Sequence, residues 1–255
     1  MSYDVQKAGM WKRISAYLFD FILLGILVVG FATLLSFVFK YDSHFDNMND
    51  CYAKYEAEYG VSFDTTSADY ETFTDEEKTN YENAVKALYA DDLFIFSHYM
   101  MVNLSFIIII FSVLAAYLIL EFAVPMFLKN GQTLGKKVFG IAVMRCDGVK
   151  IDGPLLFTRA ILGKYVIETM LPVLFLLMIV FNIVNGIIGL IAIGAIVITN
   201  IVMLIVTKDN CAIHDTISGT VAVDMASQLI FETPEALLEY KQKIHAEAAE
   251  NAQYF

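Results

Sequence analysis

Long apolar runs, separated by polar segments, dominate the pattern of the chain. Residues 14–39 and 102–124 are almost wholly apolar, and each is long enough to cross a hydrocarbon core of roughly 30 Å at about 1.5 Å per helical residue. Residues 165–206 would measure roughly 63 Å as one helix, about twice what a membrane requires. Two amides and a glycine at 181–186 interrupt this run and predict a turn between a third and a fourth span. The pattern therefore predicts four transmembrane helices.

Composition agrees with this pattern. Of the 255 residues, 58% are hydrophobic, and the mean hydropathy of +0.59 exceeds what the core of a soluble domain demands. The first apolar run is longer than the core of a secretory signal, which has about 7 to 15 residues and ends at small residues. We interpret it as a membrane anchor.

The runs divide the chain into six parts, each with its own character. They are a cytoplasmic N-terminal segment with the first span (1–39), an acidic extracytoplasmic insertion (40–101), the second span (102–124), a basic cytoplasmic loop with a hairpin and an interfacial helix (125–164), the third and fourth spans (165–206), and a cytoplasmic His-Asp motif with a C-terminal helix (207–255).

The distribution of lysine and arginine predicts the orientation. Thirteen of the 17 lie before the first span, between the second and third spans, or after the fourth, and the other four share residues 40–101 with 14 Asp and Glu. Because cytoplasmic loops carry the excess of positive charge, both termini are expected in the cytoplasm and residues 40–101 outside. We expect a multi-pass membrane protein. The acidic segment disfavours nucleic acid as a partner.

Residues 40–101 contain repeated tyrosines among the acids, which favours helices over disorder. Thr74 and Glu77 form a capping-box pattern that predicts a helix running into the second span. An earlier helix is expected near 43–59, ending at Gly60. This segment is either a surface that binds a cation or a basic partner, or a solvated acidic ectodomain.

Arg13, Ala16, Tyr17 and Asp20 follow helical spacing and form one stripe on the first span. Asp20 lies about 10 Å into that helix, where a carboxylate requires a partner, a proton or water. Arg13 is its nearest candidate partner.

The loop after the second span carries two further signals. An Asp-Gly pair at 147–148, between residues 141–145 and 149–151, predicts a β-hairpin. Gly153-Pro154 predicts a short interfacial helix. We expect its apolar side chains to face lipid and its basic ones to contact headgroups or acids: Leu155, Leu156, Ile161 and Leu162 in the first group, Arg159 and Lys164 in the second.

Three motifs resemble those of the RDD family of bacterial membrane proteins, named for one arginine and two aspartates. They are Arg13-x-x-Ala16-x-x-x-Asp20, Gly131-x-Thr133-x-Gly135-Lys136-Lys137, and His214-Asp215 with Thr220-Val221, in family order. The resemblance implies Arg13, Asp20 and Asp215 as the named residues, and it suggests transport of ions or small solutes. The chain departs from the family in its insertion at 40–101 and in the sequence Lys-Asp-Asn-Cys at 208–211, where a more basic run is usual.

The candidate site combines the family motif with nearby charges: Arg13, Asp20, Arg159, Glu168, His214 and Asp215. These residues form either a structural network that fixes the helices to the cytoplasmic loops or an ion site. The acids lie near the cytoplasmic ends of their helices, and a relay across the membrane would need ionisable groups near the midplane. His214 either gates by protonation or pins a loop.

No motif indicates an enzyme. One histidine with scattered acids does not form a metal site, and we find no nucleophile motif, phosphate loop or cysteine pair. We therefore expect no catalytic residues, no metal and no cofactor.

The expected fold is an all-α membrane protein: a bundle of about four transmembrane helices with a cytoplasmic β-hairpin and a helical acidic extracytoplasmic insertion. Thr233-Pro234 predicts the start of a C-terminal helix. Function is expected either in transport of ions or small solutes, or in a scaffold, assembly or immunity-like role that depends on the ectodomain. The candidate contacts are the lipid bilayer, a protein partner at residues 40–101 or at the C-terminal helix, and a second copy of the chain.

Overall fold

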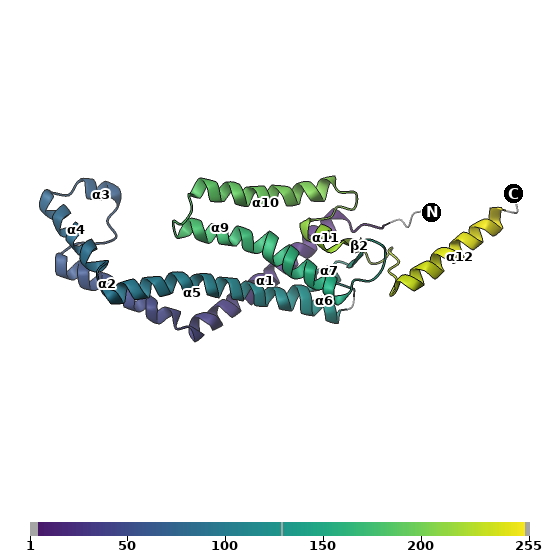
Figure 1. Cartoon of the computed structure of the whole chain (residues 1–255), viewed down its shortest axis with the longest axis horizontal. Helices are drawn as coiled ribbons and strands as arrows, with labels where there is room; N and C mark the ends of the chain where they lie inside the picture. Colours follow the sequence, from purple (N-terminus) through teal and green to yellow (C-terminus); the bar gives the residue numbers. More distant parts are fainter. Residues whose placement is uncertain (1–4, 129, 253–255) are drawn as a thin grey trace. The chain divides into compact units, whose positions relative to one another are not determined.

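The computed structural model describes residues 5–128 and 130–252 of the chain (Figure 1). The described residues are mostly helical and contain one two-stranded sheet. The chain divides into two compact units. Gly30–Phe111 forms one, which we call the 30–111 unit, and Met1–Val29 with Ser112–Phe255 forms the other, which we call the bundle unit.

Four helical stretches among the described residues are long and apolar enough to cross a membrane, which agrees with the predicted number. They are α1 (Met10–Val38); Asp92–Phe127, made of α5 (Asp92–Tyr117), the π-helix η1 (Leu118–Ala123) and α6 (Val124–Phe127); Gly153–Val180, made of α8 (Gly153–Phe157), the π-helix η2 (Thr158–Met170) and α9 (Leu171–Val180); and α10 (Gly186–Val206).

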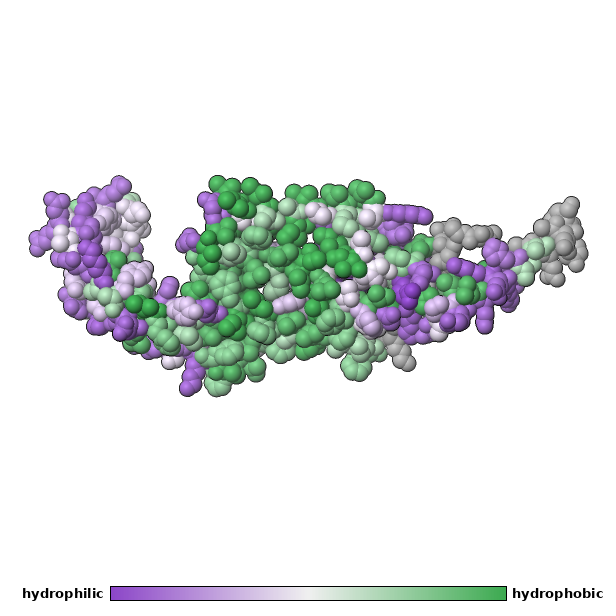
Figure 2. Space-filling view, viewed as in Figure 1, coloured by the Kyte–Doolittle hydropathy of each residue, from purple (hydrophilic) through white to green (hydrophobic). Residues whose placement is uncertain are grey.

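The predicted turn between the last two spans is confirmed. Helices α9 and α10 lie side by side (Figure 1), joined at Asn182, which has a left-handed φ of 54°, and at Asn185, whose side chain accepts the Ile187 N–H at 3.0 Å. Their outer surface is largely hydrophobic (Figure 2). A Cβ at Gly189 would lie 2.6 Å from Ile179 Cδ1, so this glycine lets the two helices approach closely.

The interfacial helix predicted after Gly153 is not a separate element. Residues Gly153–Val180 form one continuous helical stretch, and Asp152 caps its start by accepting the Leu155 N–H at 3.0 Å. Leu156, expected to face lipid, is buried against Val143 and Ile151 instead. The prediction was wrong because the helix continues into the third span, so this side chain packs on the sheet.

The predicted hairpin is only partly present. Gly148, with φ of 95°, turns the chain, and one bridge joins Met144 to Lys150. The main partner of β1 (Ile141–Arg145) is instead β2 (Thr220–Asp224), antiparallel and in a register that pairs Val143 with Ala222. β1 pairs with β2 because Val221 and Val223 bury their side chains against Ala142 and Met144. Residues 149–151 alone do not supply such a core.

The short helices α7 (Leu134–Val138) and α11 (Ile213–Ser218) complete this part of the bundle unit. We call α7, β1, α11 and β2 the collar. The C-terminal helix α12 (Pro234–Ala252) begins where predicted, with Thr233 accepting the Ala236 N–H at 3.2 Å.

The 30–111 unit contains α2 (Tyr41–Tyr59), α3 (Ser67–Glu71) and α4 (Asp75–Leu88). As predicted, α2 ends at Gly60, which has a left-handed φ of 66°, and Thr74 opens α4 with a capping box. The expectation that α4 runs into the second span was wrong, because the chain turns between Tyr89 and Asp91 before α5 begins.

Aromatic side chains form the core of the 30–111 unit. Phe94 is 1% exposed and packs its ring against Tyr52 and Tyr89 at centroid distances of 5.3 and 5.4 Å. Cys51, Tyr55 and Leu88 complete this core. The surface over α2, α3 and α4 is mostly hydrophilic (Figure 2).

Candidate functional site: a buried charge network

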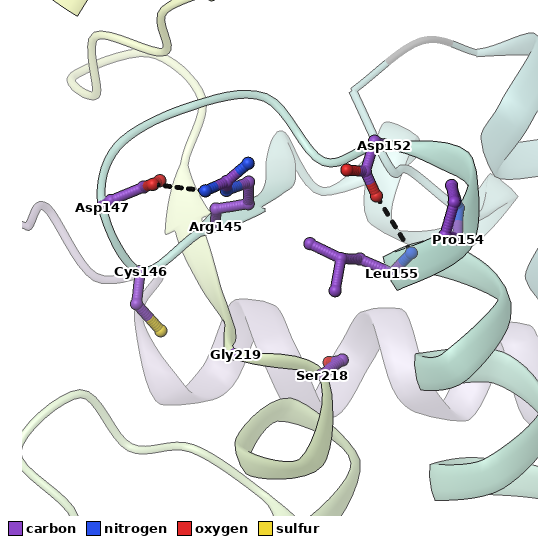
Figure 3. A pocket seen from close by; sticks show the side chains of 8 residues that line it. All are labelled: Arg145, Cys146, Asp147, Asp152, Pro154, Leu155, Ser218 and Gly219. Atoms are coloured by element: carbon purple, nitrogen blue, oxygen red, sulfur yellow. Dashed lines mark hydrogen bonds and ion pairs between the residues drawn. The ribbon is translucent and has the colours of Figure 1, made fainter. Parts of the chain in front are cut away.

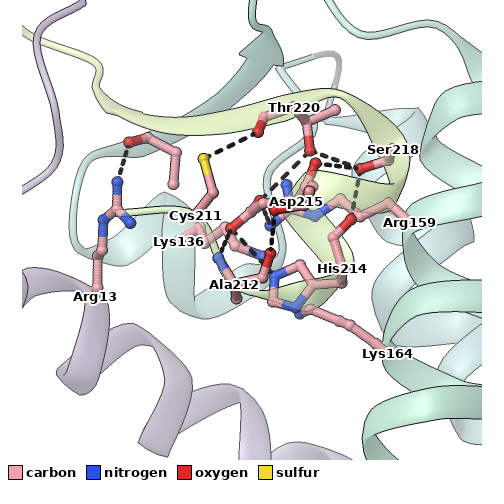
Figure 4. A network of polar contacts seen from close by, with 12 residues as sticks. Arg13, Lys136, Arg159, Lys164, Cys211, Ala212, His214, Asp215, Ser218 and Thr220 are labelled. Carbon is pink, nitrogen blue, oxygen red and sulfur yellow. Dashed lines mark hydrogen bonds and ion pairs between the residues drawn. The ribbon is translucent and has the colours of Figure 1, made fainter. Parts of the chain in front are cut away.

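The polar residues of the bundle unit gather where its apolar helices meet the collar (Figure 4). In this unit α1 begins at Met10, α6 ends at Phe127, α8 begins at Gly153 and α10 ends at Val206, and the collar segments connect these ends. We call the ionisable side chains that pair there the charge network: Glu121, Lys136, Arg159, Lys164, Glu168, His214 and Asp215.

Arg159 and Asp215 form the most deeply buried pair. Arg159 Nη2 lies 2.8 Å from Asp215 Oδ1, and each side chain is 4% exposed. Asp215 also accepts the Ala212 N–H at 3.2 Å, which caps α11. Burial alone would raise the pKa of Asp215, but the charge of Arg159, the nearby His214 and this N–H outweigh it and hold the pKa at about 2. The carboxylate is therefore ionised at neutral pH.

His214 connects this pair to a second acid. Its Nδ1 lies 2.8 and 2.9 Å from the two carboxylate oxygens of Glu168, and its Nε2 lies 3.6 Å from Asp215 Oδ2. Its backbone N–H also donates to Glu168 at 3.1 Å. Burial lowers the pKa of His214 against the opposing charge of Asp215, which favours the neutral ring at pH 7.

Gly163 allows α11 to approach η2 this closely. A Cβ at position 163 would lie 2.5 Å from His214 Cβ and 2.6 Å from His214 Cα. Non-bonded carbon atoms do not approach this closely, so any larger residue at position 163 would displace α11. The geometry of the His214 contacts therefore depends on this glycine.

The π-helical turns of η2 bring its charged residues onto one face. Arg159 and Lys164 are five positions apart, and at 3.6 residues per turn an α-helix would place Arg159 on a different side from Lys164 and Glu168, which are four positions apart. In a π-helix the hydrogen bonds join residues five apart, so side chains at these spacings lie on successive turns. The Leu171 N–H, bonded to Val166 O, marks this pattern at the end of η2. Both π-helices of the described chain carry network residues, η1 contributing Glu121.

Glu121 lies between two lysines. Lys164 Nζ donates to Glu121 Oε1 at 2.5 Å, and Lys136 Nζ lies 3.8 Å from Glu121 Oε2. Burial lowers the pKa of Lys136 to about 7; Glu121 opposes this shift, whereas Lys164 and Arg159 add to it. The Glu121 carboxylate is thus the counterion of two largely buried ammonium groups.

Asp20 does not pair with Arg13, contrary to the sequence-based expectation. Asp20 is 6% exposed and accepts hydrogen bonds from the Thr133 hydroxyl and, at 2.7 Å, from the Gly135 N–H at the start of α7. Position 135 must be glycine, because a Cβ there would collide with the carbonyl of Ala16. The expectation failed because the collar supplies neutral donors for this acid.

Arg13 instead fastens the chain segments around β2. It donates to the carbonyl oxygens of Ala8 at 3.2 Å, Asn210 at 2.7 Å and Ala222 at 2.5 Å. These acceptors belong to the N-terminal segment, to the loop after α10 and to β2. Arg13 therefore acts in the structure as a clamp on backbone carbonyls.

A pocket opens beside the network, between the start of α8 and the loop that precedes β2 (Figure 3). It is lined by Arg145, Cys146, Asp147, Asp152, Pro154, Leu155, Ser218 and Gly219. Its charged groups are already engaged, since Arg145 pairs with Asp147 at 2.7 Å and Asp152 caps α8. No group of three or more His, Cys, Asp or Glu among the described residues is arranged to hold a metal ion.

The sequence was also compared with known proteins. The model of the RDD family matches residues 7–219, a range that includes every residue of the charge network as well as Arg13 and Asp20. The chain belongs to the RDD family. It is therefore a member of a family of membrane proteins, which agrees with its four apolar helices. No curated protein and no solved structure matches the chain.

The structure brings four of the six predicted site residues into direct contact: Arg159, Glu168, His214 and Asp215. Arg13 and Asp20 make separate contacts with the collar. Glu121, Lys136 and Lys164 were not among the predicted site residues, although Lys164 was expected to contact headgroups or acids and does contact Glu121. Lys136 stands in the second family motif, which was a usable signal, whereas Glu121 and Lys164 pair through helices that only the folded chain places side by side.

Proposed function

We propose that this RDD-family protein is a membrane scaffold that transports nothing, in which the charge network fixes the helices to the collar and the 30–111 unit recognises a protein partner. The observation that carries the proposal is that each buried acid of the bundle unit is already bonded: Asp20 to Thr133 and Gly135, Glu121 to Lys164, and the others to Arg159 and His214. No buried carboxylate in the described part of the bundle unit is therefore left free to take up a passing cation.

The apolar helices supply further support. Helices α9 and α10 contain no Asp, Glu, Lys, Arg or His. A proton or cation path would need ionisable groups at membrane depth. The charged groups instead concentrate near the helix ends that adjoin the collar, which suits an anchoring role.

The proposal includes an orientation and a partner class. We place both termini and the collar in the cytoplasm and the 30–111 unit outside, because lysine and arginine are concentrated in the terminal segments and the central loop. The excess of acids in residues 40–101 suits a partner with a basic surface. The proposal assigns no catalytic role.

Transport of an ion or a small solute is the second candidate. It is favoured by Asp20, a carboxylate that is 6% exposed in a membrane-spanning helix and has no lysine or arginine nitrogen of the described chain within 4 Å.

Flux measurements in proteoliposomes separate the two functions. We expect wild-type protein to pass no H⁺, Na⁺ or K⁺ above empty vesicles, and Asp20→Asn to lower thermal stability. Asp147→Asn, in an exposed ion pair, is the matched control. Cation flux in the wild type that a folded Asp20→Asn protein lacks would establish transport.

A second experiment tests the orientation and the partner. A membrane-impermeant thiol reagent should reach the exposed Cys146 only in opened cells. Replacing residues 41–98 by a short linker should abolish partner binding while the bundle unit stays folded. Labelling of Cys146 in intact cells, or unchanged binding by the shortened protein, would contradict the proposal.

A further inference from the structure

Two cations of the charge network have hydrogen-bond donors that the described chain leaves unused. Lys136 Nζ approaches Glu121 only to 3.8 Å, which is too far for a hydrogen bond, and it donates to no other described residue. Arg159 Nη1 is buried and has no acceptor in the described part of the chain, although Nη2 of the same side chain binds Asp215. Buried donors without acceptors are costly, and each requires an explanation.

The acids nearby do not accept from these donors in the structure. Glu121 accepts from Lys164 at 2.5 Å, and Asp215 accepts from Arg159 Nη2 and from the Ala212 N–H. Asp20 is close enough to raise the pKa of Lys136, but its oxygens bind Thr133 and Gly135. An acceptor from outside the chain can therefore serve the two unused donors.

The unused donors face a common interior. In Figure 4 the side chains of Lys136, from α7, and of Arg159 and Lys164, from η2, converge beside α11. The charges of Arg159 and Lys164 both reach the Lys136 ammonium. The Lys136 and Lys164 side chains are 13% and 12% exposed, so the site is buried without being closed.

We propose that Lys136, Lys164 and Arg159 form a binding site for a phosphate group, with Lys136 Nζ and Arg159 Nη1 as its hydrogen-bond donors. A phosphate group has several strong acceptor oxygens, so it can serve donors that approach from two directions. This site goes beyond the scaffold role and does not depend on it.

The phosphate group has two sources with the same chemistry, a phospholipid headgroup or free phosphate. The position of the site suits a headgroup. The stretch Asp92–Phe127 has 36 residues and would measure about 54 Å, against a hydrocarbon core of about 30 Å, so its ends extend beyond that core. Glu121 lies six residues from the collar end of this stretch.

The test uses full-length protein stripped of lipid in a maltoside detergent. Thermal unfolding is followed while either inorganic phosphate or a short-chain phosphatidylglycerol is added, with ionic strength matched by chloride. We expect the Tm of the wild type to rise with the ligand, by about 3 °C or more for each tenfold increase above its Kd. A response to inorganic phosphate identifies free phosphate as sufficient, and a response to the lipid alone identifies a headgroup.

Matched variants locate the site. Lys136→Gln should weaken the apparent Kd at least about tenfold, which corresponds to the loss of a charged hydrogen bond, and Lys136→Arg should restore most of the response. The neighbouring Lys137, which is exposed and pairs with no acid of the described chain, serves as control: Lys137→Gln should respond as the wild type does. Equal responses of Lys136→Gln and Lys137→Gln would overturn the assignment.

A measurement on the wild type alone keeps the proposal testable if Lys136→Gln does not fold. Native mass spectrometry of mildly extracted protein should show one retained phospholipid or phosphate per chain, which is lost on stripping. Absence of any bound phosphorus, together with a Tm that neither ligand changes, would contradict the proposal. Lys136 Nζ and Arg159 Nη1 would then donate only to water.

Discussion

The two compact units treat charge in opposite ways. The bundle unit buries its ionisable groups in pairs, and Arg159 and Asp215 keep only 4% of each side chain exposed. The 30–111 unit leaves most of its acids in solvent. Its paired Lys86 and Glu82 are 73% and 59% exposed, Asp91 in the pair with Lys54 is an exception at 17%, and the core consists mainly of aromatic rings. Buried charges depend on their partners, whereas exposed ones contribute little. The bundle unit should therefore be sensitive to charge changes, and the 30–111 unit to changes in packing.

The largest expected effect is the loss of one partner of the buried pair. Arg159→Met leaves Asp215 charged and buried, which should cost about 3–5 kcal/mol of unfolding free energy. The Tm in detergent measures this change. Arg145→Met, in the half-exposed pair with Asp147, should cost no more than about 1 kcal/mol. Equal losses in the two variants would contradict the expectation that a buried charge depends on its partner more than an exposed one does.

A packing change should affect the other unit. Leu88 is 2% exposed in the core with Cys51, Tyr55 and Phe94, so Leu88→Ala should cost about 2–5 kcal/mol. Hydrogen exchange should rise in α2 and α4 and stay unchanged in η2 and α11. Lys86→Ala, at an exposed position on the same helix, should change the stability by less than about 0.5 kcal/mol. Faster exchange in η2 would show that the units do not unfold separately.

A smaller effect is expected from one methyl group between α11 and η2. Gly163→Ala places a Cβ 2.5 Å from His214 Cβ, and the resulting displacement should cost about 1–3 kcal/mol. Gly25→Ala in α1 is the matched control, because no atom lies within 4 Å of its Cβ and alanine favours a helix. The Tm of the two variants should move in opposite directions. If Gly163→Ala left the Tm unchanged, the close contact between α11 and η2 would not be required for stability.

The smallest effect is a pH dependence from His214. Its pKa is lowered, so the unfolded chain binds more protons than the folded chain as pH falls through 6.5, the ordinary value. Stability should therefore be fully present above pH 6.5 and decline toward pH 5. Asp215, with a pKa of about 2 against an ordinary 3.8, keeps its contribution over this interval and loses it only in stronger acid.

His214→Gln provides the check. It removes the titrating ring beside Glu168, Asp215 and Arg159, so the Tm difference between pH 7.5 and pH 5 should shrink. His245, on the exposed surface of α12, is the control position. If His245→Gln flattens the pH dependence instead, the network histidine does not titrate in this range.

Much of the fold was predictable because its signals are local. The apolar runs, the turn near Asn182, the cap at Thr74 and the stop at Gly60 each depend on a few adjacent residues. The pairing of β1 with β2 was not predictable in this way, since the nearby residues 149–151 offered a more local partner and only burial of Val221 and Val223 decides the competition.

The site was harder to predict than the fold. The family motif identified Arg13, Asp20 and Asp215, but their partners lie in distant segments of the chain. Arg159 lies five residues before Lys164, so a search at 3.6 residues per turn groups Lys164 with Glu168 and leaves Arg159 out. Local wide turns of this kind are invisible to periodicity, although they are frequent at functional positions.

The clamp formed by Arg13 has a consequence for biosynthesis. Two of its acceptors, Asn210 and Ala222, are made about 200 residues later, after the ribosome has produced all four apolar helices. The hydrogen-bond donors of Asp20, which are Thr133 and Gly135, are likewise synthesised long after the first helix. Contacts between such distant segments form slowly, since a long loop must close first. The first helix therefore enters the membrane before these partners of Arg13 and Asp20 exist, and the collar closes only after β2 has been made.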